Sequence, residues 1–310
     1  MHSAKKWPYF LLLLAAIFWG FAFAAQDSAA VVPPFTLGAC RCFIAGIFLI
    51  FVILILDPIR KSGRRLFSGK GIGIQKDEWI GGALCGVIMA VATALQQFGI
   101  AGGTDGGKAA FITALYVVLV PVYSLFLGKK AAPHVWISIG IAMAGFYLLC
   151  IKKDFTADLS DLFIAAGTLV FPFHILTIGH YSSRCDCIRL SAVQFFSAGF
   201  VNLILALITE RPVSFPLIWA NILPLLYLGI VSSGVAYTFQ IIAQKYVNPT
   251  AASIILSLES VFGVIGTALF LHQTLSGREY AGCVIVFLAV LLSQLDFRRR
   301  KKPEAESKTE

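Results

Sequence analysis

The sequence predicts an all-α polytopic membrane protein of ten transmembrane helices arranged as two inverted five-helix repeats. Three observations predict this fold: an apolar composition, a series of apolar runs of membrane length, and a weak similarity between the two halves of the chain. Of the 310 residues, 58% are hydrophobic and 13% are charged, and the mean hydropathy is +0.83. A soluble domain of this size is far less apolar.

The apolar runs are separated by helix breakers, among them Pro33-Pro34, Gly102-Gly103 and Asn248-Pro249. Each run has about the length of a helix that crosses a ~30 Å hydrocarbon core. The predicted spans are 8–26, 35–56, 78–100, 108–127, 134–151, 160–180, 188–209, 219–243, 250–271 and 279–297. The first run follows Lys5 and Lys6 as a signal peptide would, but we interpret it as a retained span because the repeat requires a first helix.

The positions of the basic residues predict the orientation in the membrane. Most of the 25 Lys and Arg residues fall in the loops and tails on the side of the two termini, which indicates that both termini are cytoplasmic. The expected location is the plasma (inner) membrane, with multiple passes. A net charge of +9 suits a nucleic-acid partner only in a soluble protein, and no alternation of basic and aromatic residues supports one here.

The two halves of the chain are similar in two registers. A shift of 143 residues superposes Gln97 on Gln240 and Leu115 on Leu258, so helices three to five resemble helices eight to ten. A shift of 153 superposes Phe43 on Phe196, so helix two resembles helix seven. Because five spans per half is an odd number, the halves must lie in opposite orientations, which is the architecture of alternating access. The predicted units are 1–155 and 156–297, followed by a basic and then charged cytoplasmic tail at 298–310.

The ninth span contains one charged side chain, Glu259, near its middle. A charged side chain at the centre of a membrane helix costs roughly 2.5–3.5 kcal/mol on insertion scales. We therefore expect Glu259 to be protonated, paired or facing a watery cavity, and we regard it as the candidate for proton coupling. Its counterpart in the 143 register is Tyr116, which places both residues near the midplane, where inverted-repeat transporters bind their ligands.

Other polar and aromatic side chains within the spans are further candidates. Gln97 and Gln240 either line a substrate path or bond a neighbouring helix, because a buried amide needs partners for its donors and its acceptor. Trp19 is either a stacking wall or a packing residue, and His174 is either a hydrogen-bonded structural residue or a proton carrier. The predicted substrate-binding set is Trp19, Gln97, Tyr116, His174, Tyr237, Gln240 and Glu259.

One in-span cation is assigned a structural role. Arg41 is expected either to pair with a carboxylate or with carbonyls, or to extend its head towards the membrane surface. Cys185-Asp186-Cys187 is interpreted as a pair of loop thiols, since no second Cys/His pair accompanies it, and no metal or other cofactor is expected. The chain has no His-Glu-x-x-His pair, no Gly-x-Ser-x-Gly elbow and no two in-span carboxylates placed to form a dyad, so no catalytic residues are assigned and an enzyme is disfavoured.

Four segments in this order resemble the EamA-like family of the drug/metabolite transporter superfamily, over about Trp7 to Asp296. They are Phe18-Trp19-Gly20, Arg41 with Phe43 and Ala45, Lys108-Ala109-Ala110-Phe111 through Val120-Pro121, and Ser257-Leu258-Glu259-Ser260. Two positions depart from the family pattern: Ser260 replaces the proline of Glu-Pro, and Gly128-Lys129-Lys130 replaces an acidic residue after helix four.

The resemblance implies a secondary active transporter, in the direction of efflux, for a small metabolite or drug-like compound such as an amino acid or a related molecule. The expected partners are this small-molecule substrate, protons as the coupling ion and the lipid bilayer. A passive channel or facilitator with the same cavity is the main alternative, and an intramembrane enzyme is the less favoured one. No oligomeric state is predicted.

Overall fold

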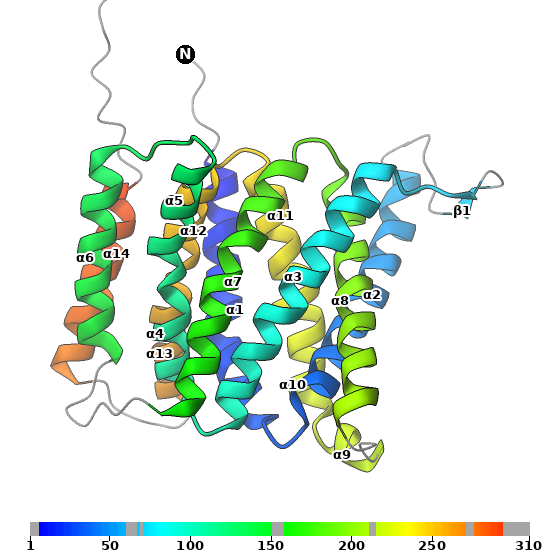
Figure 1. Ribbon diagram of the computed structural model, residues 1–310, viewed down its shortest axis with the longest axis horizontal. Helices are drawn as coiled ribbons and strands as arrows, with labels where there is room; N and C mark the ends of the chain where they lie inside the picture. Colours follow the sequence, from blue (N-terminus) through cyan, green and yellow to red (C-terminus); the bar gives the residue numbers. More distant parts are fainter. Residues whose placement is uncertain are drawn as a thin grey trace, which may run out of the picture.

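The protein is a bundle of helices that run along one common direction (Figure 1). This computed structural model describes residues 6–59, 67–68, 71–150, 158–210, 215–270 and 276–293. Its helices are α1 (Trp7–Ser28), α2 (Pro34–Ile59), α3 (Lys76–Ala101), α4 (Gly106–Ala114), α5 (Tyr116–Phe126), α6 (Pro133–Cys150), α7 (Leu159–Tyr181), α8 (Cys187–Thr209), α9 (Phe215–Ala220), α10 (Ile222–Leu226), the π-helix η1 (Tyr227–Tyr237), α11 (Thr238–Gln244), α12 (Pro249–Leu256), α13 (Glu259–Phe270) and α14 (Gly277–Ser293). Two short antiparallel strands, β1 (Phe67–Ser68) and β2 (Gly71–Ile72), follow α2.

Eight helical segments of the described chain are long and apolar enough to cross a membrane, so the protein is a polytopic membrane protein. They are Trp7–Ser28, Pro34–Ile59, Lys76–Ala101, Gly106–Phe126, Leu159–Tyr181, Cys187–Thr209, Ile222–Gln244 and Pro249–Gly266. The two other predicted spans correspond to α6 and α14. The 17 residues of α14 form a helix of about 25 Å, which is shorter than a ~30 Å hydrocarbon core. Ten spans therefore remain a prediction. Residues 151, 271 and 294–297 of the predicted runs lie outside the described residues, as does the predicted tail at 298–310.

Two of the spans are interrupted at equivalent positions. Leu115 separates α4 from α5, while Ser257 and Leu258 separate α12 from α13. The Leu115 amide donates to the Ile112 carbonyl at 3.3 Å, and the Leu258 amide donates to the Ile255 carbonyl at 3.1 Å. These bonds reach back three residues instead of four, which tightens the backbone locally. Because Leu115 and Leu258 superpose in the 143 register, each half of the chain has its break at the same place.

Helix η1 is an 11-residue π-helix between α10 and α11. π-Helices are rare and usually short, and those that occur are often found at functional sites. Gly229 and Gly234 let η1 pack closely on α2, since a Cβ on Gly229 would lie 2.5 Å from Ile44 Cγ2. The Ser232 carbonyl of η1 accepts a 2.9 Å hydrogen bond from the Trp19 indole of α1. The π-helix and α1 are thereby joined midway along the bundle.

The long helices pack in pairs, in an order that crosses between the halves of the chain. α2 packs on α8, α6 on α14, α3 on α7, and α1 on η1 and α11. Figure 1 shows α6 and α14 together at one side of the bundle, α2 and α8 at the other, and α1 near the middle. If the two halves are exchanged, the α2–α8 pair and the α6–α14 pair each map onto themselves, while the α3–α7 pair maps onto the packing of α1 against η1 and α11.

Candidate functional site

A cavity lies between the two broken helices, with α1, α2, α3, α7, η1 and α11 completing its wall. The centres of water molecules can occupy about 40 Å³ of it, which is room for roughly three waters. Its wall combines aromatic rings with several buried polar side chains, and it is therefore the place in the described chain where polar groups from both halves converge. We take it as the candidate functional site.

Six of the seven side chains that the sequence predicted as substrate-binding line this cavity: Trp19, Tyr116, His174, Tyr237, Gln240 and Glu259. The seventh, Gln97, is not among the lining residues, and its Nε2 donates to the Gln26 carbonyl at 3.4 Å. Its neighbour Gln96 lines the cavity instead and donates to Thr113 Oγ1 at 2.9 Å. Adjacent residues of a helix point about 100° apart. An assignment from sequence spacing that is wrong by one position, Gln97 instead of Gln96, therefore names a residue on another face of the helix.

Glu259 and Tyr116 begin α13 and α5 immediately after the two breaks. Both side chains are buried, Glu259 with 5% of its surface exposed. The Tyr116 hydroxyl faces the Glu259 carboxyl as a hydrogen-bonding neighbour, although the contact is not a well-formed hydrogen bond, and Tyr116 Oη and Glu259 Oε1 have no other partner within the described chain. Helix α1 closes over this position at Gly20, where a Cβ would lie 2.8 Å from the Glu259 carbonyl oxygen.

Arg41 extends from α2 into the cavity wall with 6% of its surface exposed. Its Nη1 donates to Gln26 Oε1 at 3.0 Å, and its Nε and Nη2 donate to Ser233 Oγ at 3.2 and 3.1 Å. Within the described residues no carboxylate lies within ion-pair distance of it. The sequence placed Arg41 in a structural role with carboxylate or carbonyl partners, whereas the structure gives it neutral side-chain partners and a place facing the cavity.

His174 is buried on α7, where its Nε2 lies 3.0 Å from Gln194 Oε1. Its ring meets Tyr237 edge-on at 5.6 Å between centroids, and Tyr237 in turn lies 4.5 Å from Trp19. His174 is thus both hydrogen-bonded to a neighbouring helix and part of the wall. Gln194 is the residue that superposes on Arg41 in the 153 register, so the two halves place a neutral and a charged group at equivalent positions.

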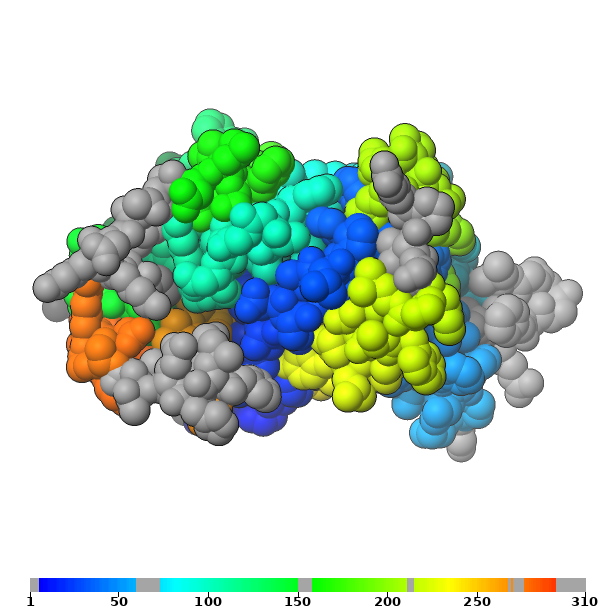
Figure 2. All heavy atoms as spheres, turned by 90° about the horizontal axis from the view of Figure 1, so that it is seen from below, coloured from blue at the N-terminus to red at the C-terminus, as the bar shows by residue number. Residues whose placement is uncertain are grey.

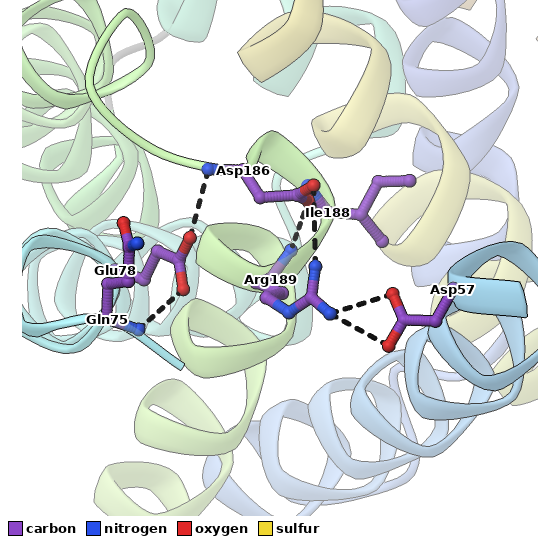
Figure 3. Close-up of polar contacts among 6 residues, drawn as sticks. All are labelled: Asp57, Gln75, Glu78, Asp186, Ile188 and Arg189. Carbon is purple, nitrogen blue, oxygen red and sulfur yellow. Dashed lines mark hydrogen bonds and ion pairs between the residues drawn. The ribbon is translucent and has the colours of Figure 1, made fainter. Parts of the chain in front are cut away.

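A buried ion pair closes the end of the bundle at which α1 begins (Figure 3). Nη2 of Arg189, in the first turn of α8, contacts both carboxylate oxygens of Asp57 at 2.7 and 2.8 Å. Arg189 also lies 3.5 Å from Asp186, and the Asp186 amide donates to Glu78 of α3 at 3.1 Å. This cluster joins the ends of α2, α3 and α8. Sequence reasoning missed it because Arg189, the second residue of the predicted span 188–209, was used only as one of the basic residues that indicate topology.

The opposite end is closed by two other contacts. Lys108 Nζ lies 2.6 Å from Asp161 of α7, which also accepts a 2.9 Å bond from Thr104. Glu210, after α8, accepts from the Phe35 and Thr36 amides at 2.7 and 2.8 Å. Figure 2 shows this end face, with α1 and the start of α2 between α4 and the α9–α10 segment. Polar contacts between helices therefore lie at both ends of the bundle, beyond the residues that line the cavity.

A larger groove, of about 760 Å³, lies on the other side of α1 and is lined mainly by apolar side chains such as Ile17, Phe21 and Leu223. The Tyr227 hydroxyl crosses it to the Phe18 carbonyl at 2.8 Å. A second groove, of about 680 Å³, runs between α5 and α7 and includes Leu84 of α3, the residue that superposes on Tyr227 in the 143 register. Neither groove gathers polar groups as the central cavity does.

Within the described residues no group of three or more His, Cys, Asp and Glu side chains is arranged to hold a metal ion. Cys185 is buried between α7 and α8. Its burial, and the nearby carboxylates of Glu78 and Asp77, raise the pKa of this thiol to about 11. The Cys185 thiol is therefore protonated at physiological pH, which makes it a weak ligand and a weak nucleophile.

Comparison with known proteins identifies the family. The model of the EamA-like transporter family matches residues 6–151 and again residues 158–295. The chain belongs to the EamA-like transporter family. This confirms the resemblance inferred from the four sequence segments, and it makes the protein a multi-pass membrane protein of a family of transporters.

Three relatives of this EamA-like protein cover nearly its whole length. An uncharacterized transporter of Archaeoglobus fulgidus is 29% identical, over 92% of this chain and 84% of that one. The uncharacterized inner membrane transporter YedA of Escherichia coli K12 is 24% identical, over 95% and 93%. The uncharacterized transporter YoaV of Bacillus subtilis is 22% identical, over 94% and 97%. The names of these relatives are those of transporters, not enzymes.

A solved crystal structure superposes on this EamA-like protein with a TM-score of 0.75. The match covers 94% of this chain and 97% of the other, at 16% sequence identity. At that identity the likeness supports the fold alone.

Proposed function

We propose that this EamA-like protein is a ten-helix secondary active transporter that exports a small metabolite or drug-like compound by alternating access. One observation carries the proposal: three buried polar atoms of residues that line the cavity, Tyr116 Oη, Glu259 Oε1 and Gln240 Oε1, make no well-formed hydrogen bond in the described chain, where the only hydrogen-bonding neighbour of Tyr116 Oη and Glu259 Oε1 is the other residue of this pair. A buried polar atom without a partner costs roughly 1–3 kcal/mol. Several such atoms around one cavity are expected where water or a ligand completes the bonding.

The backbone around the cavity supports the same proposal. Discontinuous membrane helices of inverted-repeat transporters place half-helix ends at the substrate site near the midplane. Here the half-helices α5 and α13 begin at Tyr116 and Glu259, on the wall of the cavity. We propose 1–155 and 156–297 as the inverted repeats, with both termini on the cytoplasmic side of the inner membrane.

The polar contacts at the two ends are the proposed gates. The cavity admits roughly three waters, so a metabolite enters only when one end opens and the cavity widens. Opening the end where α1 begins separates Arg189 from Asp57, while opening the other end separates Lys108 from Asp161. Rocking of the two repeats exposes the site to one side at a time.

The first experiment establishes transport. A thermal-shift screen of amino acids, nucleosides, polyamines and cationic drugs identifies ligands, because a ligand stabilises the folded state that it binds. Each ligand is then tested for saturable uptake and counterflow in proteoliposomes of the full-length protein. Saturation with counterflow is expected for a carrier. Flux that is linear in ligand concentration and shows no counterflow would favour the alternative, a passive facilitator.

The second experiment tests Glu259 as the proton-coupling residue. Its carboxyl is buried at a helix break and faces the cavity, where it can exchange a proton with whichever side is open. Glu259→Gln is expected to keep counterflow and to lose accumulation driven by a pH gradient. If the dependence on the gradient is unchanged in Glu259→Gln, another group carries the proton.

A further inference from the structure

The central cavity contains a buried cation that no carboxylate neutralises within the described chain. Arg41 is held by the amide oxygen of Gln26 from α1 and by the hydroxyls of Ser232 and Ser233 from η1. These partners are dipoles without net charge. A charge at the centre of a membrane costs roughly 2.5–3.5 kcal/mol on insertion scales, and neutral partners leave it without a counter-ion.

The hydrogen bonds of the guanidinium are incomplete as well. A guanidinium has five N–H donors, two of them on each terminal nitrogen. Nη1 of Arg41 makes one bond, to Gln26, and so keeps an N–H with no acceptor in the described chain. The bond from Nη2 to Ser232 Oγ is 3.5 Å, at the limit of hydrogen bonding. Arg41 thus has both uncompensated charge and spare donor capacity on the wall of a cavity.

We propose that Arg41 is the anion subsite of this cavity, and that the ligand carries a carboxylate or a comparable oxyanion that binds its guanidinium. The planar fork of a guanidinium matches a carboxylate through two parallel N–H···O bonds. Gln26 and Ser233 hold this fork towards the cavity. The inference rests on the proposed function, since it names the class of substrate that the transport site takes.

The remaining polar groups of the wall orient such a ligand. Glu259 is the one acidic side chain that lines the cavity in the described chain, and it lies beyond ion-pair distance from Arg41. A ligand that reaches across the cavity presents its anionic group to Arg41 and a donor group, such as an ammonium or a hydroxyl, to Glu259. Gln194, the residue equivalent to Arg41 in the second half of the chain, is uncharged. The anionic group of the ligand therefore binds only at Arg41, and the ligand has one orientation although the two halves of the chain are similar.

The experiment compares acids with their amides on the purified full-length protein. Alanine, leucine and phenylalanine are each tested as the free acid and as the carboxamide, and propionate, 4-methylvalerate and 3-phenylpropionate serve as acids that lack the amine. Thermal unfolding and calorimetric titration give the affinity. We expect at least one amino acid to stabilise the protein while its carboxamide, which keeps the ammonium group and lacks the carboxylate, does not. The acids without an amine show whether the ligand is a zwitterion or a simple anion.

Two variants assign this preference to Arg41. Arg41→Gln is expected to bind the preferred acid at least ten-fold more weakly and no better than its amide. Arg278→Gln is the matched control, because Arg278 lies over the Tyr147 ring at 5.3 Å, outside the cavity, and its loss removes the same charge. The control is expected to retain the preference for the acid.

Ser233→Asp supplies a test that does not depend on the folding of Arg41→Gln. Ser233 Oγ is 3.1 Å from the guanidinium, so an Asp at this position places an internal carboxylate on Arg41. This variant is expected to unfold at a higher temperature without ligand and to lose its response to acids. Retention of the acid preference in Arg41→Gln or in Ser233→Asp would overturn the proposal, as would equal binding of acids and amides by the intact protein.

The same ligands separate this proposal from the proposed function. Acid-selective binding without counterflow would keep the anion subsite and reject transport. Counterflow that uses acids and amides equally would reject the subsite and keep transport.

Discussion

The two broken helices share one backbone plan and differ in the residue that begins their second half. Asp105 caps α4 by accepting from the Lys108 amide at 3.0 Å, and Asn248 caps α12 by accepting from the Ala251 amide at 2.9 Å. These caps superpose in the 143 register, as do the breaks at Leu115 and Leu258. After the break, one helix presents a tyrosine and the other presents Glu259. The backbone follows the repeat, while the chemistry of the site does not.

The same contrast holds between α2 and α8. Arg41 and Gln194 are both buried and equivalent in the 153 register, but Arg41 is a cation held by neutral groups, whereas Gln194 bonds His174 and Met89. In the proposed mechanism, a symmetric scaffold lets the two repeats exchange roles as each side opens. The proposed asymmetric site would bind the ligand in one orientation and exchange protons at a single carboxyl, that of Glu259.

The largest expected effect is a difference in gradient-driven accumulation between variants of Glu259 and Tyr116, the residues that follow the two breaks. Glu259→Gln removes the proposed proton-exchanging group and is expected to abolish accumulation driven by a pH gradient. Tyr116→Phe removes only a hydroxyl and is expected to retain it. Uptake in proteoliposomes with and without the gradient measures both. Equal loss in the two variants would mean that the sites after the breaks act as one unit, contrary to the asymmetry described above.

The next effect concerns the carboxylates of Asp57 and Glu210, which superpose in the 153 register. Asp57→Asn leaves Arg189 without its closest carboxylate in a buried site, and breaking a buried ion pair costs about 3–5 kcal/mol. Glu210→Gln weakens bonds to the first amides of α2 and is expected to cost about 0.5–2 kcal/mol, as for a lost helix cap. Thermal or denaturant unfolding in one detergent compares them. A smaller loss for Asp57→Asn than for Glu210→Gln would contradict this order.

A smaller effect is expected at the contact between α1 and the second broken helix. Gly20→Val places a side chain against the Glu259 carbonyl and Phe262, and overpacking of this kind costs about 1–3 kcal/mol. Gly140→Val on α6 is the control, because no atom lies within 4 Å of a Cβ at that position. The difference in unfolding temperature between the two variants measures the packing. No difference would show that α1 can move away from the break without cost.

The smallest expected effect is at the two N-caps. Asp105→Ala and Asn248→Ala each remove one side-chain acceptor, at a cost of about 1 kcal/mol. If the two halves share their backbone plan, the losses in unfolding free energy should agree within a few tenths of a kcal/mol, measured by denaturant unfolding. Clearly unequal losses would show that the half-helices differ in stability although they superpose in sequence.

Much of this description could be predicted from the sequence alone. The apolar runs located the helices to within a few residues, and the 143 register placed Tyr116 and Glu259 at equivalent points of the two halves. Six of the seven predicted site residues line one cavity. The sequence reasoning did not find the π-helix, the ion pair between Asp57 and Arg189, or the place of Gln96 in the wall.

The sequence by itself determined the membrane class, the family and the approximate position of each long helix, because these depend on apolar length and on matches that are local in the chain. Only the tertiary structure decided which face of each helix meets the cavity, since a rotation of about 100° separates Gln96 from Gln97. It also decided the partners of Arg41, which lie 15 and about 190 residues away along the chain, at Gln26 and at Ser232 and Ser233. Contacts of that range depend on how the helices pack, and no local pattern encodes them.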